Sequence, residues 1–257
     1  MDSIIAWIGG KKSLCDTLIP MFPAKYERYI EVFGGGGWLL FKKQPESFEV
    51  YNDFNGDLVN LFRMVRERPD DLIAAFDYDL HSRAELFEAK EKLKSRAYKD
   101  DLERAYLFYK INMSSFSQNM NTFATKPRSL KLGIFKDAAK RLSSVAIENR
   151  DFEELIKIYD RPESFFYCDP PYYGTEDMYQ NINFTRETHE RLRDCLARIE
   201  GRFLLSYNNC EEIRQLYDRP GFYIQTASRM NNMGTGQYAE LIISNYDTDE
   251  NKTQITF

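Results

Sequence analysis

Segments typical of buried β-strands alternate along most of this chain with segments typical of helices, and this alternation constrains the fold more than any other feature. Strands separated by helices pair in parallel, and the helices then cover both faces of the sheet. The last two strands follow each other without an obvious helix, so we expect an antiparallel ribbon at the C-terminal edge. The sequence therefore predicts an α/β fold with a mostly parallel sheet. The predicted strands are 28–33, 47–53, 144–152, 164–171, 202–208, 222–228 and 239–246, and helices are predicted at 55–69, 186–199 and 209–218.

The region from about residue 70 to residue 142 interrupts this alternation, because it is mostly helical and charged, with polar breaks. An insertion within an α/β domain explains such a change of pattern. We predict one domain formed by residues 1–56 and 143–257, with residues 57–142 as a helical insert.

Simple features of the chain disfavour several classes of protein. No apolar run approaches the roughly 20 residues of a membrane-spanning helix, and the N-terminus lacks the basic start and cleavage site of a signal peptide. The four cysteines lie far apart without a CxxC pair, and neither His81 nor His189 has a second ligand at helical spacing. We therefore expect a cytoplasmic protein with free thiols, no membrane association and no metal site.

The overall charge and its local distribution point in different directions. The net charge is −5 and the isoelectric point is about 5.3, which argues against a surface coated with basic residues. Between Lys126 and Arg141, however, six basic residues accompany one acid, Asp137. A local patch of this kind can contact phosphates in an acidic protein. A solvated loop and helix face is the alternative.

A glycine run follows the first predicted strand, in the sequence EVFGGGG at 31–37. Glycines at a strand-to-helix turn let the backbone approach a ligand closely. The run matches neither the dinucleotide-binding GxGxxG pattern nor a phosphate-binding P-loop. Asp53 ends the second strand about 20 residues after Phe33, where an acid can accept hydrogen bonds from ribose hydroxyls. Together these features predict a cofactor that contains adenosine.

The strand predicted at 144–152 also ends in an acid and an aromatic residue, Asp151 and Phe152. Asp151 can accept a hydrogen bond from an adenine amino group, or it can cap a helix that begins with the following residues. The sequence leaves both interpretations open.

The stretch Asp169-Pro170-Pro171-Tyr172 follows the next apolar strand. The carboxylate is expected at the carboxyl edge of the sheet, where open α/β sheets bind ligands. The two prolines stiffen the turn. A carboxylate and a neighbouring carbonyl can accept both hydrogens of one amino group, and Tyr172 offers a face on which a ring can stack. The stretch predicts a pocket for the amino edge of a nucleobase.

This stretch resembles the DPPY motif of amino-group DNA methyltransferases, which use S-adenosylmethionine. Three further segments resemble, in order and spacing, motifs of the D12 class of DNA N6-adenine methyltransferases of the Dam type: WIGGKKSL (7–14), EVFGGGG (31–37) and YNDFNGDLVNLF (51–62). The resemblance covers roughly 1–62 and 144–250. It implies a Rossmann-like S-adenosylmethionine-dependent methyltransferase sheet with an inserted helical target-recognition subdomain.

The resemblance also implies roles for individual residues. Asp169 and the Pro170 carbonyl would hold N6 of the target adenine, with Tyr172 stacked on its ring. No covalent enzyme intermediate and no metal would be required. The residues implied at the cofactor are Trp7, Gly10, Lys11, Phe33, Gly34, Gly36, Asp53, Phe54, Asp151, Phe152 and Asp169.

The expected substrate is double-stranded DNA with its target adenine flipped out of the helix. The segment INMSSFSQNMNTFATKP (111–127) only loosely matches the family's target-recognition segment. The residues expected to contact DNA are Asn112, Ser114, Ser115, Asn119, Asn121, Lys126, Arg128 and Lys131. A bacterial or phage-encoded enzyme is expected, with a restriction endonuclease as one biological context.

Three other functions compete with adenine methylation. The same pair of hydrogen-bond acceptors would also suit cytosine N4 or the amino group of an RNA base. A non-catalytic DNA-binding relative is disfavoured because Asp53 and Asp169 are both intact. A dinucleotide-dependent oxidoreductase is disfavoured by the glycine pattern and by the Asp-Pro-Pro-Tyr turn.

Overall fold

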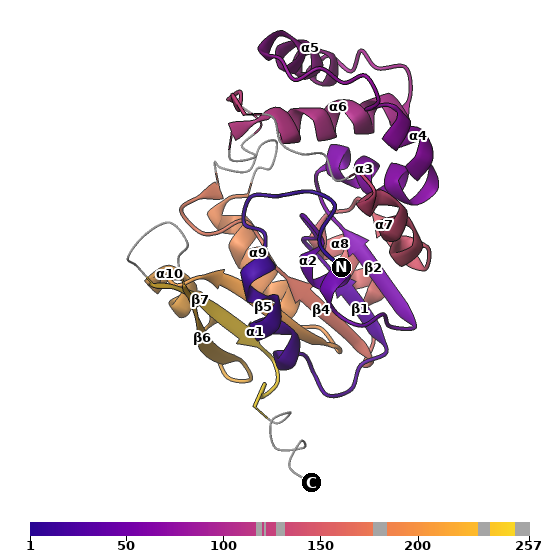
Figure 1. The fold of residues 1–257 in the computed structure, drawn as a ribbon. Coiled ribbons are helices and arrows are strands. Elements are labelled where there is room, and N and C mark those ends of the chain that lie inside the picture. The colour runs from indigo at the N-terminus through magenta and orange to yellow at the C-terminus, as the bar shows by residue number, and fades with distance from the viewer. Residues whose placement is uncertain (117–119, 121, 127–131, 177–183, 231–236, 250–257) are drawn as a thin grey trace.

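The computed structural model describes residues 1–116, 120, 122–126, 132–176, 184–230 and 237–249. In this part of the chain, seven strands form one sheet (Figure 1): β1 (Arg28–Glu31), β2 (Phe48–Asn52), β3 (Val145–Glu148), β4 (Ser164–Cys168), β5 (Arg202–Asn208), β6 (Tyr223–Met230) and β7 (Gln237–Ser244). Their order is β3-β2-β1-β4-β5-β7-β6, and the first five are parallel. The predicted α/β fold with a mostly parallel sheet is confirmed.

The last two strands form an antiparallel ribbon, as the sequence predicts. The sequence did not indicate their order, because β7 enters between β5 and β6 and leaves β6 at the edge. This order places Glu240 of β7 opposite Asn208, the last residue of β5.

Each face of the sheet packs against its own apolar core, because successive side chains of a strand point to opposite faces. Tyr29 and Tyr51 face the helices α1 (Cys15–Leu18), α2 (Trp38–Lys42), α3 (Gly56–Glu67) and α7 (Ile134–Leu142). Ile30 and Val50 face α8 (Phe152–Tyr159), α9 (Arg186–Leu196) and α10 (Glu211–Tyr217). Two short 3-10 helices, Lys12–Leu14 and Ile19–Met21, flank α1.

The parallel register brings the carboxyl ends of three central strands to one edge. Glu31, the last residue of β1, pairs with Tyr51 of β2 and with Tyr167 of β4. The chain therefore leaves β2 into Asp53 and leaves β4 into Asp169 at the same edge of the sheet.

Further helices occupy the region between β2 and β3: α4 (Pro69–Ala74), α5 (Arg83–Lys94) and α6 (Asp101–Ser114). Figure 1 shows these three helices together at one end of the molecule, with α3 and α7 nearer to the sheet. Side-chain caps at Ser82 and Asp100 begin α5 and α6, since each accepts a hydrogen bond from a backbone N–H of the first turn. The division of the chain into domains at residues 57 and 142 stays a prediction.

A buried ion-pair network ties α7 to β2. Glu49 is 1% exposed and accepts hydrogen bonds from Lys43 Nζ at 2.6 Å and from Arg141 Nη2 at 2.8 Å. Arg141 also donates to the Leu40 carbonyl at 2.8 Å. Because its guanidinium is committed inside the protein, Arg141 does not belong with the basic residues expected to contact phosphates.

Candidate active site

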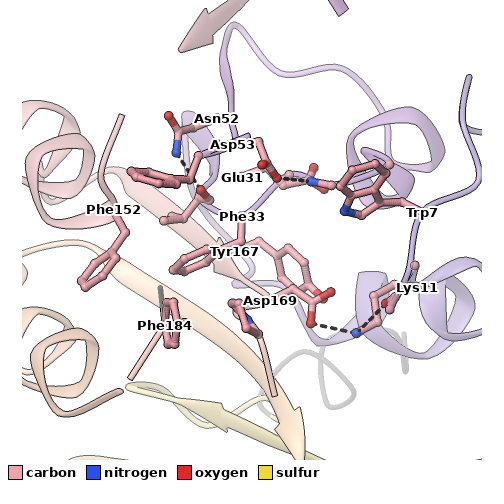
Figure 2. Close-up of a pocket in the computed structure, with 18 of the residues that line it drawn as sticks. Trp7, Lys11, Glu31, Phe33, Asn52, Asp53, Phe152, Tyr167, Asp169 and Phe184 are labelled. Atoms are coloured by element: carbon pink, nitrogen blue, oxygen red, sulfur yellow. Dashed lines mark hydrogen bonds and ion pairs between the residues drawn. The ribbon is translucent and has the colours of Figure 1, made fainter. Parts of the chain in front are cut away.

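A cavity of about 250 Å³ opens at the carboxyl edge of the central strands. Figure 2 shows the side chains that line it, with Phe33, Phe152 and Phe184 on one side and Trp7 and Lys11 on the other. All eleven residues expected at the cofactor line this cavity: Trp7, Gly10, Lys11, Phe33, Gly34, Gly36, Asp53, Phe54, Asp151, Phe152 and Asp169. Their individual roles stay predictions, but the structure brings segments that are distant in the chain to one place.

The glycine run forms a tight turn over the end of β2. Gly35 and Gly37 have φ angles of +49° and +66°, which favour glycine. A Cβ atom on Gly34 would lie 2.3 Å from Cε2 of the Tyr51 ring. The absence of a side chain at residue 34 is therefore required by the packing of the turn against β2, whether or not a ligand is bound.

Asp53 connects this turn to α3. Its Oδ2 accepts a hydrogen bond from Gly35 N at 2.8 Å, and its Oδ1 accepts one from Asn55 N at 2.8 Å. Burial raises the pKa of Asp53, and the two N–H donors oppose that rise. Each carboxylate oxygen has a second lone pair, so Asp53 can still accept hydrogen bonds from hydroxyl groups of a ligand.

Three phenylalanines form an aromatic wall. The ring centroid of Phe33 lies 5.8 Å from that of Phe152 and 6.0 Å from that of Phe184, and those of Phe152 and Phe184 are 6.4 Å apart. Flat apolar faces of this kind suit a purine ring. Phe184 was not among the predicted residues, because it precedes α9 in a segment without a recognisable motif. Phe54 also lines the cavity, but 54% of it is exposed.

Asp151 caps α8. Its Oδ1 accepts hydrogen bonds from Glu153 N at 2.9 Å and from Arg191 Nη2 at 3.0 Å. The Arg191 guanidinium carbon also lies 4.9 Å from the centroid of the Phe152 ring. Of the two interpretations left open by the sequence, the structure shows the helix cap. It does not exclude an adenine contact, since Asp151 also lines the cavity.

Asp169 lies opposite Lys11 in the cavity (Figure 2). Lys11 Nζ is 2.7 Å from Asp169 Oδ1 and donates to the Gly9 carbonyl at 3.0 Å. Ser206 Oγ donates to the same Asp169 oxygen at 3.0 Å, and Tyr167 Oη lies 2.9 Å from Ser206 Oγ. Burial raises the pKa of Asp169 to about 6, although Lys11 lowers it. Asp169 is therefore a carboxylate at neutral pH, but a more basic one than an exposed aspartate.

The turn after Asp169 is fixed to the end of β5. Tyr173 N donates to Asn208 Oδ1 at 3.1 Å, and Asn208 Nδ2 donates to the Tyr173 carbonyl at 3.0 Å. Pro171 lines the cavity. The Tyr172 ring centroid is 4.8 Å from Lys11 Nζ. Pro170 and Tyr172 do not themselves line the cavity, although each is next in the chain to Pro171, which does. Their catalytic roles stay predictions.

The residues predicted to contact DNA fall into three groups. Asn112, Ser114 and Ser115 are buried. Asn112 Nδ2 donates to the Ala6 carbonyl at 3.0 Å and Ser115 Oγ donates to the Ile111 carbonyl at 2.5 Å. Lys126 is exposed. The others, Asn119, Asn121, Arg128 and Lys131, lie outside the described residues. Base contact by the buried group stays a prediction, and it would require these side chains to leave their present surroundings.

Among the residues that the structure describes, no group of three or more His, Cys, Asp and Glu side chains could hold a metal ion. No helix in the described ranges is long and apolar enough to cross a membrane.

A mainly parallel sheet with acids and a glycine turn around one cavity at its carboxyl edge is the arrangement of a Rossmann-like methyltransferase fold. The chain belongs to the D12 class N6 adenine-specific DNA methyltransferase family, whose model matches residues 7–233. The family predicted from the motifs is confirmed. The predicted class of enzyme, an adenine-specific DNA methyltransferase, is confirmed with it.

Individual relatives have modest identity. The chain is 26% identical to "Type II methyltransferase M1.LlaDCHI" of Lactococcus lactis subsp. cremoris, over 93% of this chain and 94% of that protein. It is 28% identical to a "DNA adenine methylase" of Haemophilus influenzae, over 70% of this chain and 66% of that protein. It is 26% identical to a "DNA N-6-adenine-methyltransferase" of Escherichia phage P1, over 87% of this chain but only 32% of that protein.

Proposed function

We propose that this protein transfers a methyl group from S-adenosylmethionine directly to N6 of a flipped-out adenine at specific sites in double-stranded DNA. The observation that carries the proposal is the position of Asp169. Its carboxylate faces the same cavity as Asp53 and the aromatic wall, so a bound methyl donor and an amino group at Asp169 would be neighbours. This proximity is the main contribution that the protein needs to make, because the methyl group of the donor is already activated.

The residues of the cavity fit the cofactor. Phe33, Phe152 and Phe184 offer apolar faces to its adenine, and Asp53 has free lone pairs for ribose hydroxyls. The turn formed by Gly34 and its neighbours also lines the cavity. When bound, S-adenosylmethionine supplies an electrophilic methyl group on a positively charged sulfur.

Asp169 and the Pro170 carbonyl would accept the two hydrogens of the adenine amino group. These two hydrogen bonds favour a tetrahedral nitrogen whose lone pair is available for the methyl group. As the nitrogen–carbon bond forms and the carbon–sulfur bond breaks, the nitrogen becomes positively charged. The carboxylate stabilises that charge, and Asp169 can accept the proton that the nitrogen then loses, either directly or through water.

Flipping a base out of the helix costs a few kcal/mol, which contacts with the DNA backbone must offset. Lys126 is exposed and is our candidate among the described residues for a phosphate contact. A bacterial or phage cytoplasm is the proposed location, because a relative from Haemophilus influenzae is named a DNA adenine methylase and one from phage P1 a DNA N-6-adenine-methyltransferase. The Type II name of the Lactococcus relative supports a restriction-modification context.

Incubation with methyl-labelled S-adenosylmethionine and unmethylated duplex DNA, followed by digestion to nucleosides, tests the proposal. We expect label in N6-methyldeoxyadenosine with the wild type and none with Asp169→Ala. Label in N4-methyldeoxycytidine, or label only when RNA is offered, would overturn the substrate. Binding of S-adenosylhomocysteine without any transfer would overturn the catalytic function.

A further inference from the structure

Glu240 is a second buried carboxylate beside Asp169, and the mechanism above does not use it. It lies on β7, opposite the end of β5, and it is 4% exposed. Its Oε2 atom is 3.9 Å from Lys11 Nζ, beyond hydrogen-bond distance. Within the described part of the chain, Oε2 has no hydrogen-bond partner, and neither has the hydroxyl of Tyr172, which interacts with Glu240. A buried carboxylate oxygen without a partner is costly, so its place next to the Lys11 ammonium group needs an explanation.

One ammonium group therefore lies between two carboxylates. Lys11 Nζ contacts Asp169 Oδ1 at 2.7 Å, and a shift of about 1 Å would bring it to hydrogen-bond distance from Glu240. Lysine suits such a shift, because its ammonium is a compact charge on a flexible stem with three donors. The new contact would satisfy the oxygen that now has no partner, and this gain would offset part of the loss of the contact with Asp169.

The charge at Asp169 makes this shift useful. While Lys11 is paired with Asp169, the two charges cancel beside the atom that becomes positive during methyl transfer. Asp169 Oδ1 also accepts a hydrogen bond from Ser206 Oγ, so Lys11 and Ser206 both compete with an incoming amino group for this oxygen. Moving the ammonium to Glu240 would leave Asp169 with its full negative charge toward the amino group.

We propose that Glu240 is a positioning residue that acts through Lys11: it receives the Lys11 ammonium when the amino group of the substrate base binds to Asp169. The inference rests on the proposed function, since it assigns a role within the same site. Glu240 itself does not touch the substrate base. Its effect is to leave Asp169 as a free carboxylate acceptor without losing the lysine charge from the cavity.

Other groups also face this cluster, and they determine its pH dependence. Glu240 raises the pKa of Asp169, whereas Lys11 and Ser206 lower it. Removal of the Glu240 charge is therefore expected to lower the pKa of Asp169. The remaining titratable groups that interact with Asp169 or Glu240 among the described residues are Glu31, Tyr167, Cys168 and Tyr172.

The test compares Glu240→Gln with the wild type in single-turnover methylation of duplex DNA. We expect the rate of transfer to fall roughly tenfold, within the range typical of coupled charged groups. The acid limb of the pH–rate profile should move to lower pH, while the affinity for S-adenosylhomocysteine, measured by calorimetry, stays the same. A wild type that methylates no adenine would disprove the proposed function instead, and the two failures are therefore distinguishable.

A double-mutant cycle with Lys11→Met separates positioning from a structural role. If Glu240 acts through Lys11, Glu240→Gln causes no further loss of rate in the Lys11→Met background. An equal loss in both backgrounds would overturn the inference, and so would an unchanged rate and pH profile in Glu240→Gln.

If Glu240→Gln lowers the melting temperature, Glu240→Asp serves as a second variant, because it retains the negative charge. We then expect a rate between those of the wild type and the glutamine variant, and equal rates for both variants would overturn the inference.

Glu49→Gln is the matched control. Glu49 is a buried strand carboxylate that also contacts a lysine, at 2.6 Å, but it does not line the cavity. Its substitution should lower the melting temperature and leave the acid limb of the pH–rate profile in place. A shift of that limb as large as the one caused by Glu240→Gln would show that any buried carboxylate has this effect, and it would overturn the inference.

Discussion

Lys11 and Asp169 form an ion pair of 2.7 Å between the N-terminal segment and the end of β4. Lys11 is 4% exposed, so its charge is directed into the cavity rather than toward solvent. The pair joins two of the motifs that the sequence places far apart, and in the proposed mechanism it determines the charge that Asp169 presents to a substrate. Four predictions follow from this site and its surroundings.

The pH dependence of methylation should report Asp169. Burial raises the pKa of Asp169 to about 6, so the carboxylate form that accepts the amino group is lost as the pH falls through that value. We expect kcat/KM to fall about tenfold per pH unit below pH 6 and to be level just above it. Initial rates between about pH 5 and pH 8 at constant ionic strength measure this limb. A rate that stays level down to about pH 5, as expected for an aspartate with the ordinary pKa of 3.8, would contradict the prediction.

Asp53→Asn should weaken cofactor binding. The amide retains the shape of the side chain but loses the charge that strengthens hydrogen bonds to hydroxyl groups. Its NH2 group also replaces one of the two oxygens that accept hydrogen bonds from Gly35 N and Asn55 N. We expect the dissociation constant of S-adenosylhomocysteine to rise about tenfold, the loss of one charge-assisted hydrogen bond. Calorimetry measures it. Asp57→Asn is the control, because Asp57 pairs with Arg104 at 2.7 Å outside the cavity and should leave the affinity unchanged.

Gly34→Ala should destabilise the fold even without a ligand. The added Cβ would collide with the Tyr51 ring, which stacks on Phe62 with centroids 4.1 Å apart and cannot move freely. We expect the free energy of unfolding to fall by about 1–3 kcal/mol. Urea denaturation measures it. In Gly133→Ala, no atom of the described residues, apart from the chain neighbours of residue 133, lies within 4 Å of the new Cβ, so a similar loss in that variant would contradict the steric explanation.

Lys126→Ala should weaken DNA binding in a salt-dependent manner. If Lys126 contacts one phosphate, its loss should reduce the slope of log K against log salt by about one. Fluorescence anisotropy with a labelled duplex measures the slope. Lys25→Ala is the control, since the exposed Lys25 precedes β1 at the opposite edge of the sheet from the cavity. Equal slopes for Lys126→Ala and the wild type would exclude this contact.

Local patterns in the sequence were sufficient to predict the strands and the antiparallel ribbon, and the resemblance to the family supplied the eleven predicted cofactor residues, all of which line the cavity. In each case a short motif contains both the element and the side chain that it presents, as at Asp53 and Asp169. The order of the last two strands was not predictable in this way. Whether β7 pairs with β5 depends on tertiary packing and not on the residues of β7 alone.

Phe184, Ser206 and Glu240 were missed for the same physical reason. Each comes from a segment that has no motif of its own. Only the packing of the sheet and helices brings Phe184 to the cavity and brings Ser206 and Glu240 to Asp169 and Lys11. The opposite error affected Arg141. Its place in a basic stretch suggested a surface role, but the buried acid that holds it, Glu49, is far away in the sequence.

The contacts of Asp53 and Gly34 bear on how inactive relatives can be recognised. Asp53 holds two backbone N–H groups, and Gly34 makes room for Tyr51, so the folded chain needs both residues even if it no longer methylates anything. A descendant that had lost catalysis would still be under selection to keep them. Their presence in a sequence therefore indicates that the fold is retained and does not indicate activity. On the proposed mechanism, an intact Asp169 beside Lys11 is the better indicator of an active enzyme.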